Sequence, residues 1–160
     1  MLDVGGGSGV MSIALARKNQ HLRACVLDLA TVCEVAGGNI KRAGLSRRIS
    51  TMPGDIRRKL PVGYDVIMFC DIGLVSEQLL KSAHNGLPPG GLVVVVDRYL
   101  SDDRTKPLDR LLGSFVGSSV QLATRSDMVA RVRSCGFQAV KARSVCGDLW
   151  CITGNKSSKP

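Results

Sequence analysis

The sequence predicts an α/β domain built on a doubly wound, mostly parallel sheet. Short apolar runs with strand character alternate with longer stretches of helical spacing along the 160 residues, which is typical of βαβ units. The glycine-rich turn GGGSG at residues 5–9 follows the first apolar run directly, as in α/β proteins that bind nucleotides. The run LVVVV at 92–96 lacks polar alternation and indicates a strand buried on both faces. The length suits one domain.

Strands are predicted where a short apolar run is bounded by turn residues. They lie at residues 2–4, 22–27, 49–52, 65–69, 92–96, 137–144 and 149–153. Pro53-Gly54 ends the third strand and Gly136 precedes the sixth, because proline cannot donate to a strand ladder and glycine permits a turn.

Helices are predicted between these strands, where apolar residues recur at helical spacing. They lie at residues 10–18, 31–43, 76–85, 108–116 and 127–135. Gly37-Gly38 weakens the second helix by about 1 kcal/mol per glycine relative to alanine. The turn LPPGG at 87–91 ends the third, since proline cannot continue a helix. The domain is expected to span 1–154, followed by a polar, disordered tail at 155–160.

The composition is typical of a packed globular protein, with 44% hydrophobic and 22% charged residues. No apolar run approaches the roughly 20 residues of a membrane helix, and the first residues lack a basic and apolar leader pattern. We therefore expect a cytoplasmic protein with no membrane partner. The six cysteines and two histidines show no metal-binding spacing, which predicts reduced thiols and no metal site.

The chain is strongly basic, because 22 Lys and Arg against 13 Asp and Glu give a net charge of +9. Short clusters occur at Lys41-Arg42, Arg47-Arg48 and Arg57-Arg58-Lys59. Such a balance attracts polyanions. However, three Phe, two Tyr and one Trp offer few rings for stacking on bases. A solvated basic surface is favoured, and a nucleic-acid partner is the alternative.

The segment DVGGGSG at 3–9 joins the first strand to the first helix. Its glycines let the backbone turn tightly and bring N–H groups close to a ligand at the helix N-terminus. A dinucleotide fold needs a small residue at position 10, so Val10 disfavours a nicotinamide dehydrogenase. Asp28 lies about 20 residues beyond the loop, where a carboxylate accepts ribose hydroxyls. A nucleoside-containing ligand is expected; capping of the next helix is the alternative role for Asp28.

Several short motifs, spread along nearly the whole chain, carry a further signal. They are LDVGGGSG (2–9), VLDLATV (26–32), PGD (53–55), YDVIM (64–68), LPPGG (87–91) ahead of the strand that ends in Asp97, and SCGF (134–137). Together they resemble the Rossmann-like S-adenosylmethionine-dependent methyltransferases, most of all the small-molecule O-methyltransferases of plants and bacteria. The resemblance implies a seven-stranded sheet with an antiparallel final strand, S-adenosylmethionine as cofactor, and O-methylation of a small hydroxylated aromatic molecule.

The resemblance also implies which residues bind the cofactor. The methionine end is lined by Asp3 and the loop glycines, the ribose is held beside the second strand, the adenine lies beside the third, and the methyl group lies at the end of the fourth. In that order the residues are Asp3, Gly5, Gly7, Gly9, Asp28, Leu29, Asp55, Ile56 and Cys70. S-adenosylmethionine carries a sulfonium and an ammonium and no phosphate, so a site rich in carboxylates suits it.

The catalytic base departs from the family pattern. Those enzymes place a histidine just after the fourth strand, where this chain has FCDIGLVS at 69–76. His21 and His84 are expected at the opposite edge of the sheet, because they precede the second and fifth strands. Asp71 is the candidate base. The alternative role for Asp71 is only to contact the cofactor or to cap a turn, and Asp97 and Tyr99 are further candidate bases.

The N-terminal helical domain of those enzymes, which forms dimers and part of the substrate pocket, has no counterpart in this sequence. We therefore expect a fragment whose first strand is incompletely covered and whose solubility is poor, with any homodimer forming through the missing region. Two alternative functions stay open: an RNA methyltransferase of the same superfamily, favoured by the charge, and a non-catalytic cofactor-binding or partner module, favoured by the lost histidine.

Overall fold

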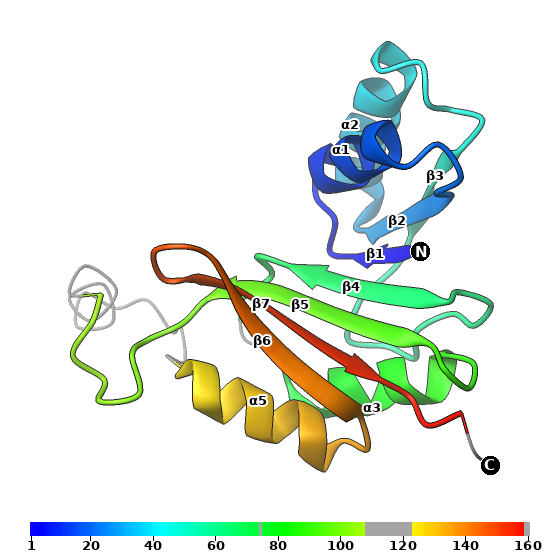
Figure 1. Cartoon of the computed structure of the whole chain (residues 1–160). Coiled ribbons are helices and arrows are strands. Elements are labelled where there is room, and N and C mark those ends of the chain that lie inside the picture. The colour runs from blue at the N-terminus through cyan, green and yellow to red at the C-terminus, as the bar shows by residue number, and fades with distance from the viewer. Residues whose placement is uncertain (74, 108–122, 159–160) are drawn as a thin grey trace.

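The computed structural model describes residues 1–73, 75–107 and 123–158. It contains a seven-stranded sheet with the order β3-β2-β1-β4-β5-β7-β6 (Figure 1). The strands are β1 (Leu2–Val4), β2 (Ala24–Asp28), β3 (Ile49–Pro53), β4 (Val66–Cys70), β5 (Leu92–Arg98), β6 (Gln138–Cys146) and β7 (Leu149–Asn155). Strands β1 to β5 are parallel, whereas β7 is antiparallel to β5 and to β6. The predicted mostly parallel sheet with an antiparallel final strand is confirmed.

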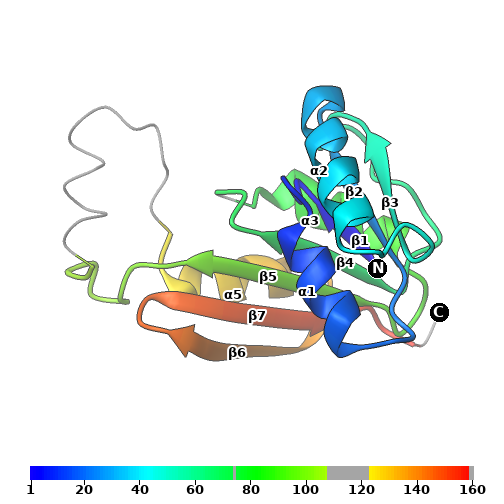
Figure 2. The ribbon, with the colours of Figure 1, turned by 90° about the horizontal axis from the view of Figure 1, so that it is seen from above.

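Helices cover both faces of this sheet. They are α1 (Val10–Lys18), α2 (Ala30–Arg42), α3 (Glu77–Gly86) and α5 (Arg125–Ser134). Helices α1 and α2 lie on one face, over β1 to β3, and α3 and α5 lie on the other face, under β4 to β7 (Figures 1 and 2). The sheet is therefore doubly wound, as predicted. In the described parts of the chain, no helix is both long and apolar enough to span a bilayer.

The two faces have separate apolar cores. On the α1–α2 side the core contains Val26, Ala36 and Ile40. On the other side Phe69 and Leu80 belong to a larger cluster that also takes residues from β5, β7 and α5. Burial of these side chains drives the packing of both helix layers onto the sheet.

Element boundaries differ from the predicted ones by a few residues. Helix α5 begins at Arg125 and not at 127, because Thr124 caps its first turn. The predicted helix at 108–116 lies outside the described residues. The prediction of a disordered tail from residue 155 is wrong for its first two residues. Asn155 belongs to β7, and Lys156 donates hydrogen bonds to the carbonyl oxygens of Leu87 and Gly91 at 2.7 and 2.8 Å.

The first strand is fully buried, contrary to the expectation that its cover is incomplete. Leu2 and Val4 are 0% exposed. Strand β1 lies between β2 and β4, with Val4 in register with Leu27 on one side and Phe69 on the other. These pairings bring the carboxyl ends of three central strands to one edge, where ligands bind in open α/β sheets.

Candidate functional site

The glycine loop turns sharply between β1 and α1. The Gly5 N–H donates to the carbonyl oxygen of Leu27 at 2.8 Å, and the Gly9 N–H donates to that of Gly6 at 2.9 Å. Gly7 has a φ of 55°, a left-handed conformation that side chains disfavour, and a Cβ built on it meets no atom within 4 Å. The space beside Gly7 is thus open to a ligand at the start of α1.

Asp28 anchors this loop to the end of β2. Its Oδ2 accepts the backbone N–H of Gly7 at 2.9 Å, and its Oδ1 accepts that of Leu29 at 2.8 Å. A carboxylate oxygen can accept more than one hydrogen bond. The half-buried Asp28 can therefore hold the loop and still receive ribose hydroxyls, as predicted for it.

Asp3 is buried under the same loop. The Ser12 hydroxyl donates to Oδ2 at 2.6 Å, whereas Oδ1 is buried and accepts no hydrogen bond from any described residue. Burial raises the pKa of Asp3, and the nearby Asp28 charge raises it further. A Cβ on Gly6 would lie 2.6 Å from the Asp3 Cγ, so only glycine permits this approach. A buried, unsatisfied carboxylate oxygen suits a cationic ligand, and the sulfonium and ammonium of S-adenosylmethionine fit it.

Just beyond the end of β3, Asp55 is bound by Arg57, which the sequence analysis places only in a basic cluster. Its carboxylate accepts from the Arg57 backbone N–H at 2.9 Å, from Nε at 3.0 Å and from Nη2 at 2.8 Å. These bonds and the Arg57 charge lower the pKa of Asp55 to about 2. Any adenine contact by Asp55 therefore involves a carboxylate already paired with a guanidinium.

Apolar side chains border the loop on the side of β3 and β4. A Cβ on Gly5 would lie 2.8 Å from Ile72 Cγ2 and 3.9 Å from Ile56 Cδ1, so both isoleucines face the first turn of the loop. Leu29, directly after Asp28, is 60% exposed. Ile56 and Leu29 were predicted from the family resemblance. Ile72 was missed, because its short distance to Gly5 arises only when β1 and β4 pair.

The end of β4 brings a thiol close to several carboxylates. Burial raises the pKa of the Cys70 thiol, followed by the charges of Asp3, Asp71 and Asp97. Asp71 is exposed and has a φ of 54°, with its N–H donating to the Val96 carbonyl oxygen at 2.9 Å. Asp97 is 5% exposed and accepts the Arg98 N–H at 2.7 Å. The predicted residues Asp3, Cys70 and Asp71 thus come together at this edge.

Both histidines lie away from this edge, as the sequence predicted. His21 lines a hollow with Arg23, Ala24 and Asp65, at the amino ends of β2 and β4. His84 is in the last turn of α3, and its ring lies edge-on to Phe137 with centroids 5.1 Å apart. Neither imidazole can act as a base for chemistry at the carboxyl ends of the strands.

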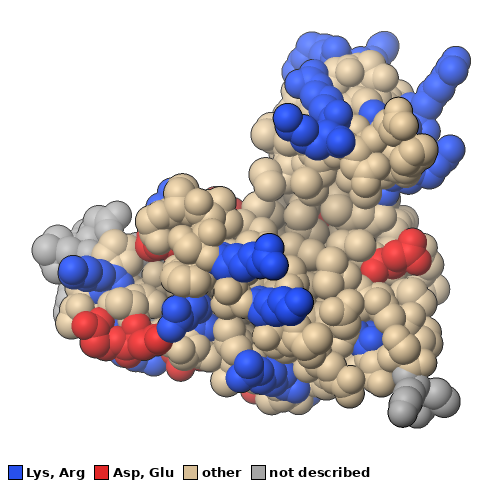
Figure 3. All heavy atoms as spheres, viewed as in Figure 1, with Lys and Arg blue, Asp and Glu red and all other residues tan. Residues whose placement is uncertain are grey.

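Basic side chains lie over more than one part of the surface. Figure 3 shows Lys and Arg over the part formed by α1 and α2, and further Lys and Arg over the lower part of the view. Exposed residues of the α1–α2 part include Arg17, Lys18, Lys41 and Arg42. The nucleic-acid alternative stays a prediction, while the residues around the glycine loop are acidic and suit a cation.

The strand order and the acid-lined glycine loop define the class of Rossmann-like methyltransferase domains. Residues 1–131 match the model of the family described as the O-methyltransferase domain, and the chain belongs to this family. The predicted family and fold are thereby confirmed.

Individual relatives agree with this assignment. The chain is 37% identical over 120 residues to an L-tyrosine C(3)-methyltransferase of Streptomyces lavendulae, covering 71% of this chain and 33% of that protein. It is 33% identical over 150 residues to a 3-hydroxy-5-methyl-1-naphthoate 3-O-methyltransferase of Streptomyces sahachiroi, covering 88% and 44%. The chain thus spans less than half the length of these two relatives.

A solved structure shows the same fold and names the cofactor. The apo crystal structure of the S-adenosylmethionine-dependent methyltransferase SibL superimposes with a TM-score of 0.86 at 32% identity, covering 98% of this chain and 50% of that one. S-adenosylmethionine is the cofactor of the family, as predicted.

Proposed function

We propose that this chain is the cofactor-binding part of an S-adenosylmethionine-dependent enzyme that methylates a small hydroxylated aromatic molecule. The observation that carries the proposal is the Asp28-anchored glycine loop above Asp3, whose Oδ1 is buried and accepts no hydrogen bond from the described residues. The two curated relatives are named for tyrosine and a hydroxynaphthoate, and both molecules carry a hydroxyl group on an aromatic ring.

Each part of the cofactor has a residue to hold it. Asp28 accepts the ribose hydroxyls, Asp3 pairs with the cationic methionine end, and Leu29 and Ile56 offer apolar contact to the adenine. When bound, the cofactor supplies an electrophilic methyl group on a sulfonium. The chain's contribution is then to hold the acceptor in line with that group, which alone can provide a large acceleration.

Asp71 is the residue that we assign to remove the proton of the acceptor hydroxyl. It follows Cys70 at the end of β4, its backbone is fixed by the bond to Val96, and its exposed carboxylate is open to a ligand. Removal of that proton makes the oxygen a better nucleophile. Asp97 is a further carboxylate whose charge acts on Cys70, but it is buried.

A second function is favoured by one specific observation. Residues 69–76 contain no histidine, and His21 and His84 lie at the amino ends of the strands. A domain that binds the cofactor without transferring the methyl group, and acts through a partner, is consistent with that loss.

Two measurements on the purified chain test the proposal. Isothermal titration with S-adenosylhomocysteine should show binding, while NAD, the control, should not bind. Incubation with S-adenosylmethionine and a panel of hydroxynaphthoates should then release S-adenosylhomocysteine. Binding without turnover on any acceptor supports the non-catalytic module. No binding by a chain that is folded by circular dichroism contradicts both functions.

A further inference from the structure

A second hollow lies at the carboxyl end of β5, beside the start of β7. It has a volume of about 460 Å³ and is bordered by Tyr99, Lys106, Pro107, Arg125 and Trp150, and we call it the Trp150 pocket. Two of these side chains are aromatic and one is proline, so much of the wall is apolar. A cavity of this size accommodates a small ring system.

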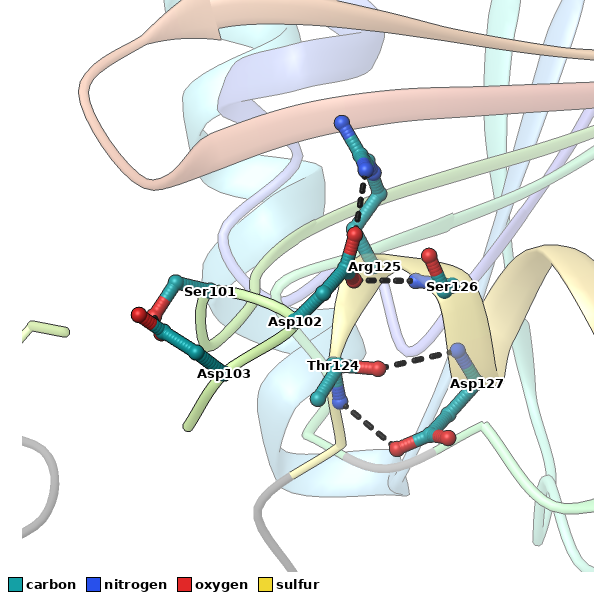
Figure 4. Close-up of polar contacts among 7 residues, drawn as sticks. All are labelled: Ser101, Asp102, Asp103, Thr124, Arg125, Ser126 and Asp127. Carbon is teal, nitrogen blue, oxygen red and sulfur yellow. Dashed lines mark hydrogen bonds and ion pairs between the residues drawn. The ribbon is translucent and has the colours of Figure 1, made fainter. Parts of the chain in front are cut away.

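One wall of the pocket is held in place by the polar network at the start of α5 (Figure 4). The Thr124 hydroxyl accepts the Asp127 N–H at 3.0 Å, and the Asp127 carboxylate accepts the Thr124 N–H at 3.0 Å, which fixes the first turn. Asp102 then accepts from Arg125 Nη2 at 2.5 Å and from the Ser126 N–H at 3.3 Å. The Arg125 side chain is thereby oriented before any ligand arrives.

This network places a cation over the indole ring. The Arg125 Cζ lies 4.8 Å from the centre of the Trp150 ring, within the range of cation–π contact. The guanidinium covers one face of the indole ring, and Asp102 holds the guanidinium in turn, so the two side chains form a stack. Planar aromatic molecules pack well against such a stack, because they lose little conformational freedom on binding.

The charges around the pocket favour an anionic group on the ligand. The two carboxylates at its border are already paired, Asp102 with Arg125 and Asp148 with Arg98, the latter at 2.7 Å. The Lys106 ammonium makes no ion pair within 4 Å in the described residues, and the anionic group whose charge it influences is the exposed Asp103 carboxylate. A carboxylate on the ring would bring a countercharge to Lys106 at the edge of an apolar wall.

The pocket also lies beside the cofactor site on the same edge of the sheet, at the next strand in the order β2, β1, β4, β5. Asp28 ends β2, the glycine loop follows β1, and Cys70 ends β4. Cys70 is in register with Val96, and the next residue of β5, Asp97, is in register with Trp150. The pocket therefore begins one strand beyond the end of the site where the methyl group is expected.

We propose that the Trp150 pocket holds the methyl acceptor, and that this acceptor is a planar aromatic carboxylic acid. Its ring packs against the stacked Arg125 and Trp150 side chains, and its carboxylate pairs with Lys106. The inference rests on the proposed function, since it assigns the substrate class of the same reaction. It goes beyond that function in naming the pocket, the anionic group and the residue that selects it.

The test uses the fact that the chain has a single tryptophan. In a ¹H–¹⁵N spectrum the one indole N–H signal belongs to Trp150 and reports on the pocket without further assignment. The probe is 1-naphthoate, and cyclohexanecarboxylate has the same charge without a planar ring. Two variants each remove one positive charge: Lys106→Gln in the pocket and, as the matched control, Arg133→Gln on the exposed side of α5.

We expect 1-naphthoate to shift the indole signal to saturation, and cyclohexanecarboxylate to bind at least about fivefold more weakly. Lys106→Gln should weaken naphthoate binding by about fivefold, as for a solvent-accessible ion pair, while Arg133→Gln leaves it unchanged. No shift with naphthoate, or equal affinities for the two variants, overturns the proposal.

A titration with S-adenosylhomocysteine in the same samples separates this inference from the proposed function. Cofactor binding with no effect of naphthoate on the indole signal overturns the pocket assignment alone. Naphthoate binding to a chain that does not bind the cofactor product overturns the proposed function, and with it the acceptor role of the pocket.

Discussion

The carboxylate of Asp28 accepts the backbone N–H of Gly7 at 2.9 Å, joining two residues 21 positions apart. The same side chain accepts the N–H of Leu29 at 2.8 Å, so it fixes the end of β2 as well as the loop. The residue that we assign to the ribose is therefore also the residue that shapes the glycine loop. Substitution of Asp28 should therefore lower cofactor affinity both by removing the ribose contact and by releasing the glycine loop.

Asp28→Ala should weaken binding of S-adenosylhomocysteine by at least about tenfold. Each hydrogen bond to a charged group contributes about 1.5–3 kcal/mol, and the alanine variant loses those to the loop and to the ribose. Asp28→Asn keeps one acceptor oxygen and should lose less. Calorimetric titration measures both, with Glu34→Gln on the exposed side of α2 as control. An unchanged affinity in Asp28→Ala would falsify the ribose assignment.

Gly7→Ala should reduce both stability and cofactor affinity. A Cβ at Gly7 meets no atom within 4 Å, so the free chain has room for it, but the φ of 55° costs an alanine about 1–2 kcal/mol. The melting temperature should fall by about 2–4 °C per kcal/mol. The added methyl also occupies the space that the cofactor needs.

Gly37→Ala is the matched control for that variant. Its Cβ also meets nothing within 4 Å, but Gly37 lies within helix α2, where alanine is favoured by about 1 kcal/mol. Gly37→Ala should raise the melting temperature and leave affinity unchanged. Equal effects of the two substitutions on affinity would contradict the role of Gly7.

Much of the fold could be predicted because its signals are local. The strand runs, the turns at Pro53-Gly54 and at 87–91, and the glycine loop each depend on neighbouring residues. Burial of β1 could not be predicted, because Leu2 and Val4 are covered by packing between distant elements. The fixed position of Lys156 likewise depends on a hydrogen bond to Leu87, which is 69 residues away in the sequence.

The candidate site was predicted in part for the same reason. Asp3, Asp28 and Cys70 stand at strand ends, and parallel pairing necessarily brings such ends together. Pairing of Asp55 with Arg57 was overlooked although the two residues are close in sequence, since Arg57 was considered only as part of a basic cluster. The contact of Arg125 with Trp150 joins α5 to β7, and no local pattern predicts it.

Asp71→Asn separates catalysis from binding. The asparagine keeps the size of the side chain and tolerates the φ of 54°, so the fold and the affinity for S-adenosylhomocysteine should not change. An amide cannot accept the acceptor's proton, and turnover on a hydroxynaphthoate should fall by about 100-fold or more. Turnover is followed by release of S-adenosylhomocysteine. A variant that keeps the wild-type rate leaves Asp71 without a catalytic role.

The pH dependence of cofactor affinity tests the role of Asp3. Burial raises the pKa of Asp3 above its ordinary value of 3.8, so the folded chain holds this proton more tightly than the unfolded chain does. The contribution of Asp3 to the free energy of unfolding is therefore lost as the pH rises from 3.8 through the raised pKa. An ammonium ligand binds the ionised carboxylate, so affinity for S-adenosylhomocysteine should increase over the same rise in pH.

Asp3→Asn should remove this pH dependence. The amide oxygen can still accept the Ser12 hydroxyl, which holds Oδ2 at 2.6 Å, but it carries no charge for the ligand. Affinity should be lower than in the wild type at neutral pH and nearly constant on acidification, whereas unfolding at neutral pH should require more denaturant because the buried charge is gone. Calorimetric titrations from about pH 4 to about pH 8 compare the two chains, with Glu34→Gln as the control for loss of a carboxylate. Parallel pH profiles for the wild type and Asp3→Asn would show that the buried carboxylate does not face the cation.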